Sequence, residues 1–464
     1  MRNLLQSVLV QGLFGDRDVR IEFPSDSQVS FLHGSNGAGK TTVLKLIDAL
    51  FNQKTTYLQE TPFQLLEVTT EEGRRASVTR SETESSQRKS RHPGSQGRPG
   101  SFRLEFEVDG VAYESSELKP DSADELGNAA SRVEEILGLE RIGRDRWIDG
   151  ATGDSLSFNE VVRRYWDDLP ASWMAAFAPQ SDELYQALKS LDVRGVEFIG
   201  ADRLLTRRPL RRRGPETFRG APAQVETPVV ETQREQLRRR ISEQLASFAE
   251  SSQILDRSFP LRLLEDLSEE RTPPTPEELS LKVDEVSKLR RSLEEVGILD
   301  RGSEELTPQR AAKADDYQRR MIDLYLRDDQ KKLEQLGPLR AQLELFLRLV
   351  NQKFERKQLT VDRNRGYELV AASGDRLSPS QLSSGEQHEL VLLYRLIFST
   401  APRTLFLIDE PELSLHVAWQ ERITEDLEEI AGLGEAQFVL ATHSPAATGD
   451  RWDLLIPLES SYKE

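Results

Sequence analysis

Two apolar runs near the C-terminus constrain the fold more than any other feature of the chain. Thr404–Ile408 and Phe438–Ala441 are too short for helices and are bounded by turn residues, which predicts buried strands. Asp409 and Glu410 follow the first run, and His443 follows the second after one threonine. Parallel α/β sheets bind ligands at the carboxyl ends of their strands. We therefore expect these three polar side chains to share a ligand-binding edge.

A third apolar run, Val29–His33, leads into a glycine-rich segment that fits the pattern Gly, any four residues, Gly-Lys-Thr. A strand before the segment and an amphipathic helix after it, here Thr42–Phe51, are the context that this phosphate-binding pattern requires. Backbone N–H groups in such a loop surround phosphates at a helix N-terminus, so the pattern predicts ATP with Mg²⁺. The residues assigned to nucleotide binding are Gly34, Ser35, Asn36, Gly37, Ala38, Gly39, Lys40, Thr41 and Thr42.

The polar side chains around this loop predict distinct roles in phosphoryl transfer. Lys40 would reach the β- and γ-phosphates, while Thr41 and Asp409 would hold Mg²⁺. Glu410 would polarise the attacking water as general base, and His443 would contact the γ-phosphate and orient that water. We therefore expect Lys40, Glu410 and His443 to form the catalytic group.

A second anion-binding arrangement is predicted at Leu382–Gln387, just before the helix-like segment Glu389–Phe398. Ser383 offers a hydroxyl group and Gly385 a backbone N–H at a helix N-terminus, where anions bind favourably. We assign Glu386 to nucleotide binding together with these two residues.

An antiparallel layer is predicted upstream, from the strand-like pieces Leu65–Thr69, Ala76–Arg80 and Phe102–Val108. This layer would flank the nucleotide base. A glutamine that senses the γ-phosphate through Mg²⁺ is expected in this region, and Gln59 and Gln64 both fit.

The composition excludes several classes of protein. The 464-residue chain has no cysteine, so it has neither a disulfide framework nor a thiolate metal site. The net charge of −17 argues against a protein that coats nucleic acid over its whole surface. No apolar run approaches the roughly 18–20 residues that span a bilayer, so we expect a cytoplasmic protein without a membrane partner.

The chain resembles the ABC-type ATPase heads of the SMC, RecF and OLD group. This resemblance implies an α/β fold: an ATPase head built on a mixed sheet with a phosphate loop and flanking helices, and with inserted helical or coiled-coil subdomains. It also implies hydrolysis of ATP to ADP and phosphate. The matching parts are the phosphate loop, the signature Leu382–Gln387, Asp409-Glu410, Ser414-Leu415-His416 and the switch residue His443.

The same resemblance implies a head-to-tail dimer. Ser383 of one subunit would close on ATP that Lys40 of the other subunit holds. Ser414 and His416 would lie near the dimer seam. Ser384 stands where many members of the group have glycine.

The resemblance also suggests domain boundaries. The head would be interrupted twice by helical insertions. The expected segments are 1–115 for the N-terminal lobe with the phosphate loop, 116–192 for a helical insertion, 193–206 for a core strand returning to the head, 207–357 for a helical hairpin-like insertion, and 358–464 for the C-terminal lobe with the signature, Asp409-Glu410 and His443.

Helix formers and charges dominate the second insertion, which predicts a short helical hairpin rather than a long antiparallel arm. A strand hairpin, Gln358–Arg363 with Gly366–Ala371, is expected to follow it. The predicted helices are Gln233–Ala249, Pro276–Val296, Gln309–Leu336 and Pro338–Lys357.

Six arginines crowd the segment Arg203–Arg213. This cluster suits a docking site for phosphate backbones or for an acidic protein, but it equally suits a solvated loop. Both interpretations stay open.

Shorter motifs resemble stand-alone ATPases of bacterial antiphage systems, with the ATPase subunits of PARIS and Septu as examples. This narrower resemblance implies a sensor ATPase that controls a separate nuclease effector. The expected partners are a second copy of the chain in an ATP-dependent dimer or larger assembly, the effector nuclease, and DNA or an acidic phage protein as trigger. The motifs are Asn36–Thr42, Phe198–Leu204, Leu255–Pro260, Ser384–Leu390 and Asp409–His416.

Other functions of this group fit less well. A transporter ATPase would carry its signature much closer to the phosphate loop than the 343 positions (383 − 40) between Lys40 and Ser383. An OLD-type nuclease would need an acidic metal-binding domain after His443, where 21 residues (464 − 443) are expected to be too few. A binding module with a dead site is disfavoured because the residues for hydrolysis are present. A DNA-repair clamp of RecF or SMC type stays open as the alternative.

Overall fold

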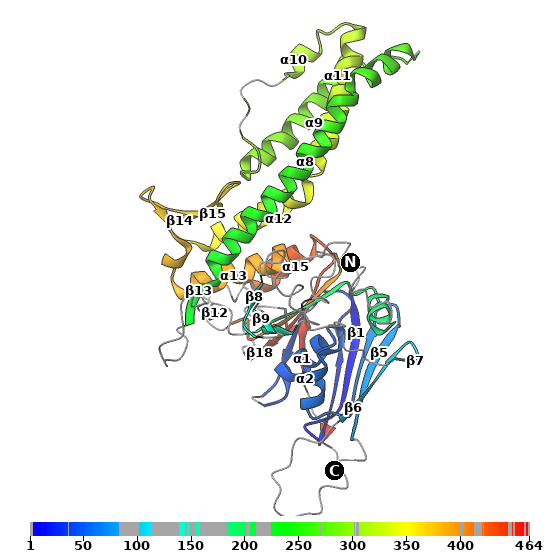
Figure 1. Ribbon diagram of the computed structural model, residues 1–464, viewed down its shortest axis with the longest axis vertical. Helices are drawn as coiled ribbons and strands as arrows, with labels where there is room; N and C mark the ends of the chain where they lie inside the picture. The colour runs from blue at the N-terminus through cyan, green and yellow to red at the C-terminus, as the bar shows by residue number, and fades with distance from the viewer. Residues whose placement is uncertain are drawn as a thin grey trace, which may run out of the picture. The chain divides into compact units, whose positions relative to one another are not determined.

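A computed structural model describes the chain in two compact units, which we call the head unit, Met1–Val229 with Ser384–Glu464, and the helical unit, Val230–Ser383. Each unit is described by itself (Figure 1). The residues described are 3–35, 37–82, 102–113, 139–143, 146–148, 155–157, 161, 183–200, 205–209, 224–269, 271–300, 302, 306–399, 402–412, 420, 422–443, 448, 451–458 and 461–462.

A five-stranded parallel sheet forms the centre of the head unit. Every residue of its two apolar strands is buried, and the rings of Phe406 and Phe438 stack with their centroids 5.1 Å apart. A strand that is buried on both faces needs a continuous apolar sequence. The two strands predicted from the apolar runs are therefore confirmed. The strands, in spatial order, are β11 (Gly195–Ile199), β17 (Thr404–Asp409), β18 (Gln437–Thr442), β3 (Val29–His33) and β19 (Leu455–Pro457).

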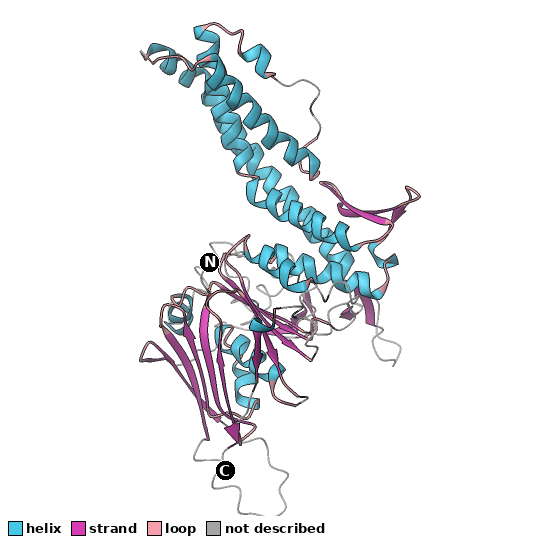
Figure 2. Cartoon of the chain, turned by 180° about the vertical axis from the view of Figure 1, so that it is seen from behind, coloured by secondary structure: helices cyan, strands magenta, loops and turns pink. Residues whose placement is uncertain are grey.

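A second sheet of seven antiparallel strands forms another layer of the head unit (Figure 2). Its strand β1 alternates between buried and more exposed residues along much of its length, as expected of a sheet with one covered face. The predicted antiparallel layer is therefore confirmed. Its strands, in spatial order, are β20 (Ser461–Tyr462), β2 (Arg17–Glu22), β1 (Leu5–Leu13), β4 (Leu65–Thr70), β5 (Arg75–Glu82), β6 (Phe102–Val108) and β7 (Val111–Tyr113).

Helix α1 (Lys40–Phe51) contacts strands of both sheets and carries much of the core that they share. Its apolar side chains, among them Leu44 and Ile47, are fully buried. The predicted α/β fold with helices flanking a sheet is thus confirmed. The other helices of the head unit that the structure describes are α2 (Thr55–Glu60), α7 (Glu183–Lys189), α13 (Ser384–Phe398) and α15 (Ile423–Ala431), with a 3-10 turn at Trp452–Leu454.

The segment 116–192, predicted to be mostly helical, contains helix α7 and also short strands where it is described. Three short strands form a small antiparallel sheet there: β8 (Glu140–Arg141), β9 (Arg146–Ile148) and β10 (Ser155–Ser157). Trp147 in β9 is fully buried. The predicted helices at 129–139 and 159–166 lie almost entirely outside the described residues.

Part of the arginine cluster is a strand, not a loop. Strand β12 (Leu205–Pro209) pairs antiparallel with β13 (Gln224–Pro228), and the register sets Arg207 opposite Glu226. The rest of the cluster lies outside the described residues.

The helical unit contains a longer element than the short hairpin that we predicted. Helix α8 (Val229–Ser268) has 40 residues, which corresponds to about 60 Å at the rise of an α-helix. The other helices are α9 (Pro276–Glu295), α10 (Pro308–Ala311), α11 (Asp316–Glu334) and α12 (Gly337–Lys353).

The predicted strand hairpin is confirmed as β14 (Lys357–Asp362) and β15 (Gly366–Ala371), and the short strand β16 (Arg376–Leu377) pairs with β15. The hairpin packs on the start of α8, where the Tyr367 hydroxyl donates to the Val230 carbonyl. Gly366 has a φ of +76°, and a Cβ there would lie 2.1 Å from the Arg234 carbonyl oxygen. The turn therefore requires glycine.

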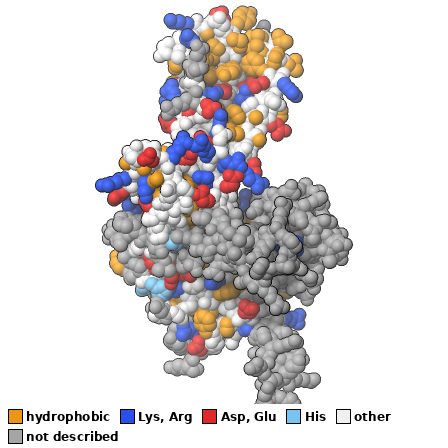
Figure 3. Space-filling model, turned by 60° about the vertical axis from the view of Figure 1, so that its left-hand side comes forward, with side chains coloured by type: hydrophobic (Ala, Val, Ile, Leu, Met, Phe, Trp, Pro, Cys, Tyr) orange, Lys and Arg blue, Asp and Glu red, His pale blue; other side chains and the backbone are white. Residues whose placement is uncertain are grey.

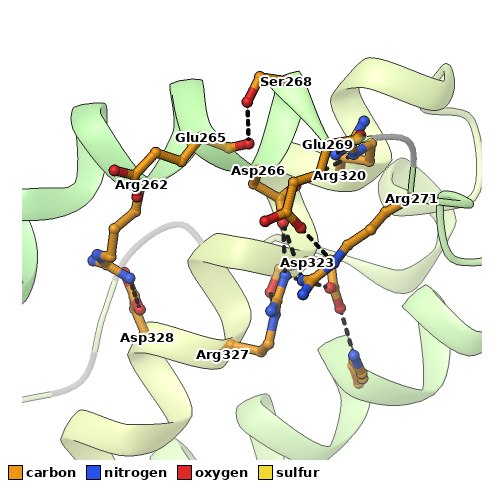
Figure 4. A network of polar contacts seen from close by, with 11 residues as sticks. Arg262, Glu265, Asp266, Ser268, Glu269, Arg271, Arg320, Asp323, Arg327 and Asp328 are labelled. Atoms are coloured by element: carbon orange, nitrogen blue, oxygen red, sulfur yellow. Dashed lines mark hydrogen bonds and ion pairs between the residues drawn. The ribbon is translucent and has the colours of Figure 1, made fainter.

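Ion pairs join α8 to α11 within the helical unit (Figure 4). Arg262 on α8 forms a two-pronged contact of 2.6 Å with Asp328 on α11. Asp266 on α8 accepts from Arg320 at 3.3 Å and lies 3.6 Å from Arg327, both on α11. These contacts fix α8 against α11 where few apolar side chains are buried.

Several large apolar side chains of this unit are exposed instead, and Figure 3 shows hydrophobic side chains gathered at the top of the view. None of the helices in the described ranges is both long and apolar enough to cross a membrane. The exposed side chains are Ile254, Leu261, Leu264, Leu281, Tyr317, Met321 and Tyr325.

Candidate functional site

The carboxyl ends of three neighbouring parallel strands bring the predicted site residues together. The register pairs Asp409 at the end of β17 with Ala441 of β18, and Thr442 of β18 with His33 at the end of β3. The residues that follow these strands therefore share one edge of the sheet, as the apolar runs predicted.

The phosphate loop follows β3 and ends at the N-terminus of α1. Gly39 caps the helix with a φ of 94°, and a Cβ at this position would lie 2.9 Å from Leu13 Cδ2. No side chain caps the helix through a hydrogen bond. The first backbone N–H groups of α1 are thus left without a side-chain acceptor, as an anion site requires. Asn36 of the loop lies outside the described residues.

Lys40 points into this loop. Its Nζ donates to the carbonyl oxygens of Gly34 and Ser35, at 2.7 and 3.2 Å, and lies 3.2 Å from His443 Nδ1. Burial lowers the pKa of Lys40, while the nearby carboxylates of Glu410, Asp409 and Glu412 oppose this shift. The loop carbonyls accept hydrogen bonds from the buried ammonium group but carry no net charge. Phosphate oxygens would supply the negative charge that pairs with this ammonium group.

The two residues predicted to hold Mg²⁺ are already in contact. Thr41 Oγ1 donates to Asp409 Oδ1 at 2.8 Å. A hydroxyl and a carboxylate are hard oxygen ligands, which suit Mg²⁺, and this ion usually takes only one or two protein ligands beside phosphate and water. The donor set fits the ion. Within the described ranges, no group of three or more histidine, aspartate or glutamate side chains could hold a metal.

Glu410 and His443 face each other across the same edge. Glu410 Oε1 lies 3.6 Å from His443 Nε2. The Glu410 backbone has a φ of 47° and its N–H donates to the Ala441 carbonyl at 2.9 Å. A positive φ is uncommon for glutamate and is found most often at functional sites. The turn after β17 therefore holds the Glu410 carboxylate in place through a strained backbone conformation.

Glu412 belongs to the site, although the sequence patterns gave it no role. Its Oε1 accepts from the Thr442 hydroxyl at 2.8 Å and from the His443 backbone N–H at 2.8 Å. The signal available in the sequence was a third carboxylate in the run Asp409 to Glu412.

The β1–β2 hairpin also contacts the phosphate loop, through the first residue of β2, which the sequence patterns did not indicate. Arg17 Nη1 donates to the Gly37 carbonyl at 2.8 Å. Phe14 is half exposed, and its ring carbon Cε2 lies 3.5 Å from the position of a Cβ on Gly39. An exposed aromatic ring beside a phosphate loop offers a stacking face to a nucleotide base.

The remaining predicted residues are not part of the contacts described above. Gly385 and Glu386 lie in the first turn of α13, and Ser383 precedes it. The Gln64 side chain lies over Gly12 of β1, and the Gln59 carbonyl accepts from Arg80 Nε. The choice between the two glutamines stays a prediction. Ser414 and His416 lie outside the described residues.

Comparison with solved structures gives SMC heads among the similar chains, and the two described here have TM-scores of 0.36 and 0.34. The SMC head domain from Thermotoga maritima is 12% identical, with 100% of this chain and 98% of that chain covered and a TM-score of 0.36. The Smc head domain with an extended coiled coil from Pyrococcus furiosus, bound to the C-terminal domain of ScpA, is 13% identical, with 99% and 95% covered and a TM-score of 0.34. No curated protein matches the sequence.

The sequence matches one protein family over residues 29–448. The match begins at the strand that leads into the phosphate loop and extends past His443, so it includes the loop, Asp409, Glu410 and His443, while Phe14 and Arg17 precede it. It covers most of the 464 residues. The chain therefore belongs to the family described as "AAA domain, putative AbiEii toxin, Type IV TA system".

Proposed function

We propose that the chain binds ATP with Mg²⁺ and hydrolyses it to ADP and phosphate. The observation that carries this proposal is the direct contact network at one sheet edge: Lys40 with His443, His443 with Glu410, and Thr41 with Asp409. Each pair joins residues of different strands or loops, so the network is a property of the fold.

Each side chain has a distinct role in this reaction. Lys40 binds the β- and γ-phosphates and offsets charge that develops on them. Glu410 takes a proton from the attacking water, and His443 orients that water against the γ-phosphate. Thr41 and Asp409 hold Mg²⁺, which neutralises charge on the phosphate oxygens when bound. Phe14 stacks on the base.

The active form in this proposal is a head-to-tail dimer. The signature residues begin helix α13, which Arg395 joins to the edge strand β11 through Glu197 at 2.8 Å. The resemblance of Leu382–Gln387 to the signature of ABC-type heads supports a site that Ser383 of a second subunit completes.

Three variants test hydrolysis and dimerisation together. Glu410→Gln should keep nucleotide binding and accumulate an ATP-bound dimer, because the base is lost while the Mg²⁺ and phosphate contacts remain. Lys40→Ala should lose nucleotide affinity, and Lys45→Ala on the same helix serves as its control. Phosphate release, nucleotide binding and light scattering with size exclusion measure the three effects. Wild-type turnover by Glu410→Gln would exclude this base, and a monomer under all conditions would exclude the dimer.

We further propose that this ATPase acts through a second protein, as the regulatory subunit of an antiphage system that restrains a nuclease effector. The family description names a toxin and a toxin–antitoxin system, which supports a role in regulated toxicity. Closure around ATP is a two-state motion, so a partner that binds one state better is held or released by the nucleotide cycle. The contacts of the phosphate site described above are all made by residues of the head unit, so the helical unit offers a surface for this partner.

The partner proposal is tested in cells that carry the native operon. Pull-down of the chain should recover a nuclease, and plating under phage challenge should require both proteins. Full protection by the ATPase alone would contradict the proposal.

A DNA clamp of RecF or SMC type is the second candidate. The length of α8, at 40 residues, favours it because long paired helices are the arms of such clamps. It requires DNA-stimulated hydrolysis without a toxic partner. Replacing Arg207, Arg208, Arg211, Arg212 and Arg213 by alanine should then weaken DNA binding and reduce its salt dependence. Unchanged binding across a salt series would leave these arginines as a solvated segment.

A further inference from the structure

The Glu412 carboxylate has no part in the reaction derived above, yet it lies within the network of site residues. Its Oε1 accepts two hydrogen bonds, from the Thr442 hydroxyl and from the His443 backbone N–H, both at 2.8 Å. Its charge also opposes the lowered pKa of Lys40. A carboxylate that accepts two hydrogen bonds on one oxygen holds both donors in fixed positions.

We propose that Glu412 is a positioning residue that fixes His443 for hydrolysis, an inference that rests on the proposed ATPase activity. His443 is the last residue before a segment outside the described ranges, and its backbone N–H lies beyond the end of β18. The neighbouring ladder bonds of β18 therefore do not hold this N–H. Glu412 supplies an acceptor in their place.

The same short segment controls both catalytic side chains. Glu410 and Glu412 are separated by Pro411, whose ring restricts the backbone between them. Glu410 approaches the His443 ring at Nε2, and Glu412 binds the His443 backbone. One turn therefore sets the distance of 3.6 Å between Glu410 Oε1 and His443 Nε2, because it carries Glu410 itself and also Glu412, which binds the His443 backbone. The Gln420 side chain donates to the Glu412 carbonyl at 3.4 Å and so restrains the backbone of this turn at Glu412.

This arrangement gives different expectations for two replacements of Glu412. Glu412→Gln keeps an oxygen that can accept both hydrogen bonds, so it should retain most of the ATPase activity. Glu412→Ala removes the acceptor and should lower kcat about 10- to 100-fold. The KM for ATP should change little, because Lys40 and the loop still bind phosphate.

A double-mutant cycle separates positioning from a general structural role. If Glu412 acts through His443, then Glu412→Ala combined with His443→Ala should be no slower than His443→Ala alone. Glu425→Ala serves as the control, since Glu425 is an exposed glutamate on α15 outside the site. Losses that multiply in the double variant would overturn the proposal.

A spectroscopic measurement tests the hydrogen bond without any turnover. The chain has five histidines, so ¹⁵N-histidine labelling gives five backbone amide signals at most. The signal that disappears in His443→Ala is that of His443. It should lie downfield in the wild type and in Glu412→Gln, and move upfield with faster exchange in Glu412→Ala.

The two readouts distinguish the possible failures. A wild type that shows the amide signal but no hydrolysis would overturn the proposed function and leave the hydrogen bond intact. Active wild type with equal activity in Glu412→Ala would overturn the positioning role. An unshifted His443 amide in Glu412→Ala would do the same.

Discussion

In the head unit, strands β17 and β18 are buried at every residue and their polar neighbours begin only where the strands end. In the helical unit, α8 and α11 meet through Arg262 with Asp328 and through Asp266 with Arg320, while large apolar side chains stay exposed. Both units bury apolar side chains, but at these two contacts the strands of the head unit bury aromatic rings whereas α8 and α11 bury charged groups. Apolar burial stabilises without regard to direction, whereas a buried ion pair depends on the geometry of both partners.

The largest expected effect follows from the apolar side of this comparison. Phe406→Ala removes a fully buried ring stacked on Phe438, and it should lower the free energy of unfolding of the head unit by about 3–5 kcal/mol. Thermal unfolding, with hydrogen exchange to localise the change, measures this. Trp452→Ala is the control, because Trp452 is 60% exposed. Equal effects of the two variants would contradict the burial argument.

A buried ion pair inside the head unit tests whether the difference in stability effect depends on the unit or on the type of contact, apolar or ionic. Arg395 on α13 is 3% exposed at its side chain and pairs with Glu197 of β11, which is 10% exposed. Glu197→Ala leaves the guanidinium buried without its charge partner and should cost about 3 kcal/mol. Replacement of both residues by apolar ones should recover much of this loss. Failure to recover would mean that the pair has a specific role in placing α13.

The matching change in the helical unit should have a smaller effect. Asp328→Ala removes the partner of Arg262, but the Arg262 side chain is 27% exposed and water can replace part of the contact. The expected cost is about 2 kcal/mol, localised to α8 and α11. Asp284→Ala removes an exposed ion pair with Lys288 within α9 and should change stability by less than about 0.5 kcal/mol. A loss that equals that of Phe406→Ala would remove the contrast between the two units.

The smallest effect is a pH-dependent one at an exposed turn. The backbone N–H of Arg75, and then the Arg74 guanidinium, hold the pKa of Asp109 below 3.8. Because the folded-state pKa is lowered, this contribution is present above the unfolded-state pKa and disappears as the pH falls through the folded value. Asp109→Asn should be slightly less stable than the wild type at neutral pH and equal to it at an acidic pH below the folded-state pKa of Asp109. Unfolding curves at both pH values measure this difference, and a gap that persists in acid would assign it to another cause.

Much of the head could be predicted because its signals are local. The runs at β3, β17 and β18 are apolar throughout, and the glycine pattern before Lys40 needs only a strand and a helix as context. The helical unit was predicted less well. Its helices were expected, but the continuous length of α8 was not: the predicted helix ended at Ala249, whereas α8 continues through Pro260 to Ser268.

The sequence patterns missed the residues that reach the site only through tertiary contacts. Glu412, Phe14 and Arg17 lie close to site residues in space, and each contacts a position that is distant in sequence. Their residue types are ordinary at turns, so no local pattern distinguishes them. The strand β12 within the arginine cluster was missed for a similar reason, since it depends on pairing with β13.

The sequence by itself determined which residues we predict to bind phosphate and Mg²⁺, because backbone conformation in the loop and donor chemistry are local properties of Gly34–Thr41 and Asp409. The tertiary structure alone decided that Thr41 meets Asp409 and that His443 lies between Lys40 and Glu410. Thr41 and Asp409 are 368 positions apart in the sequence (409 − 41). Strand order and register set these contacts, and both depend on the packing of the whole sheet rather than on any one segment.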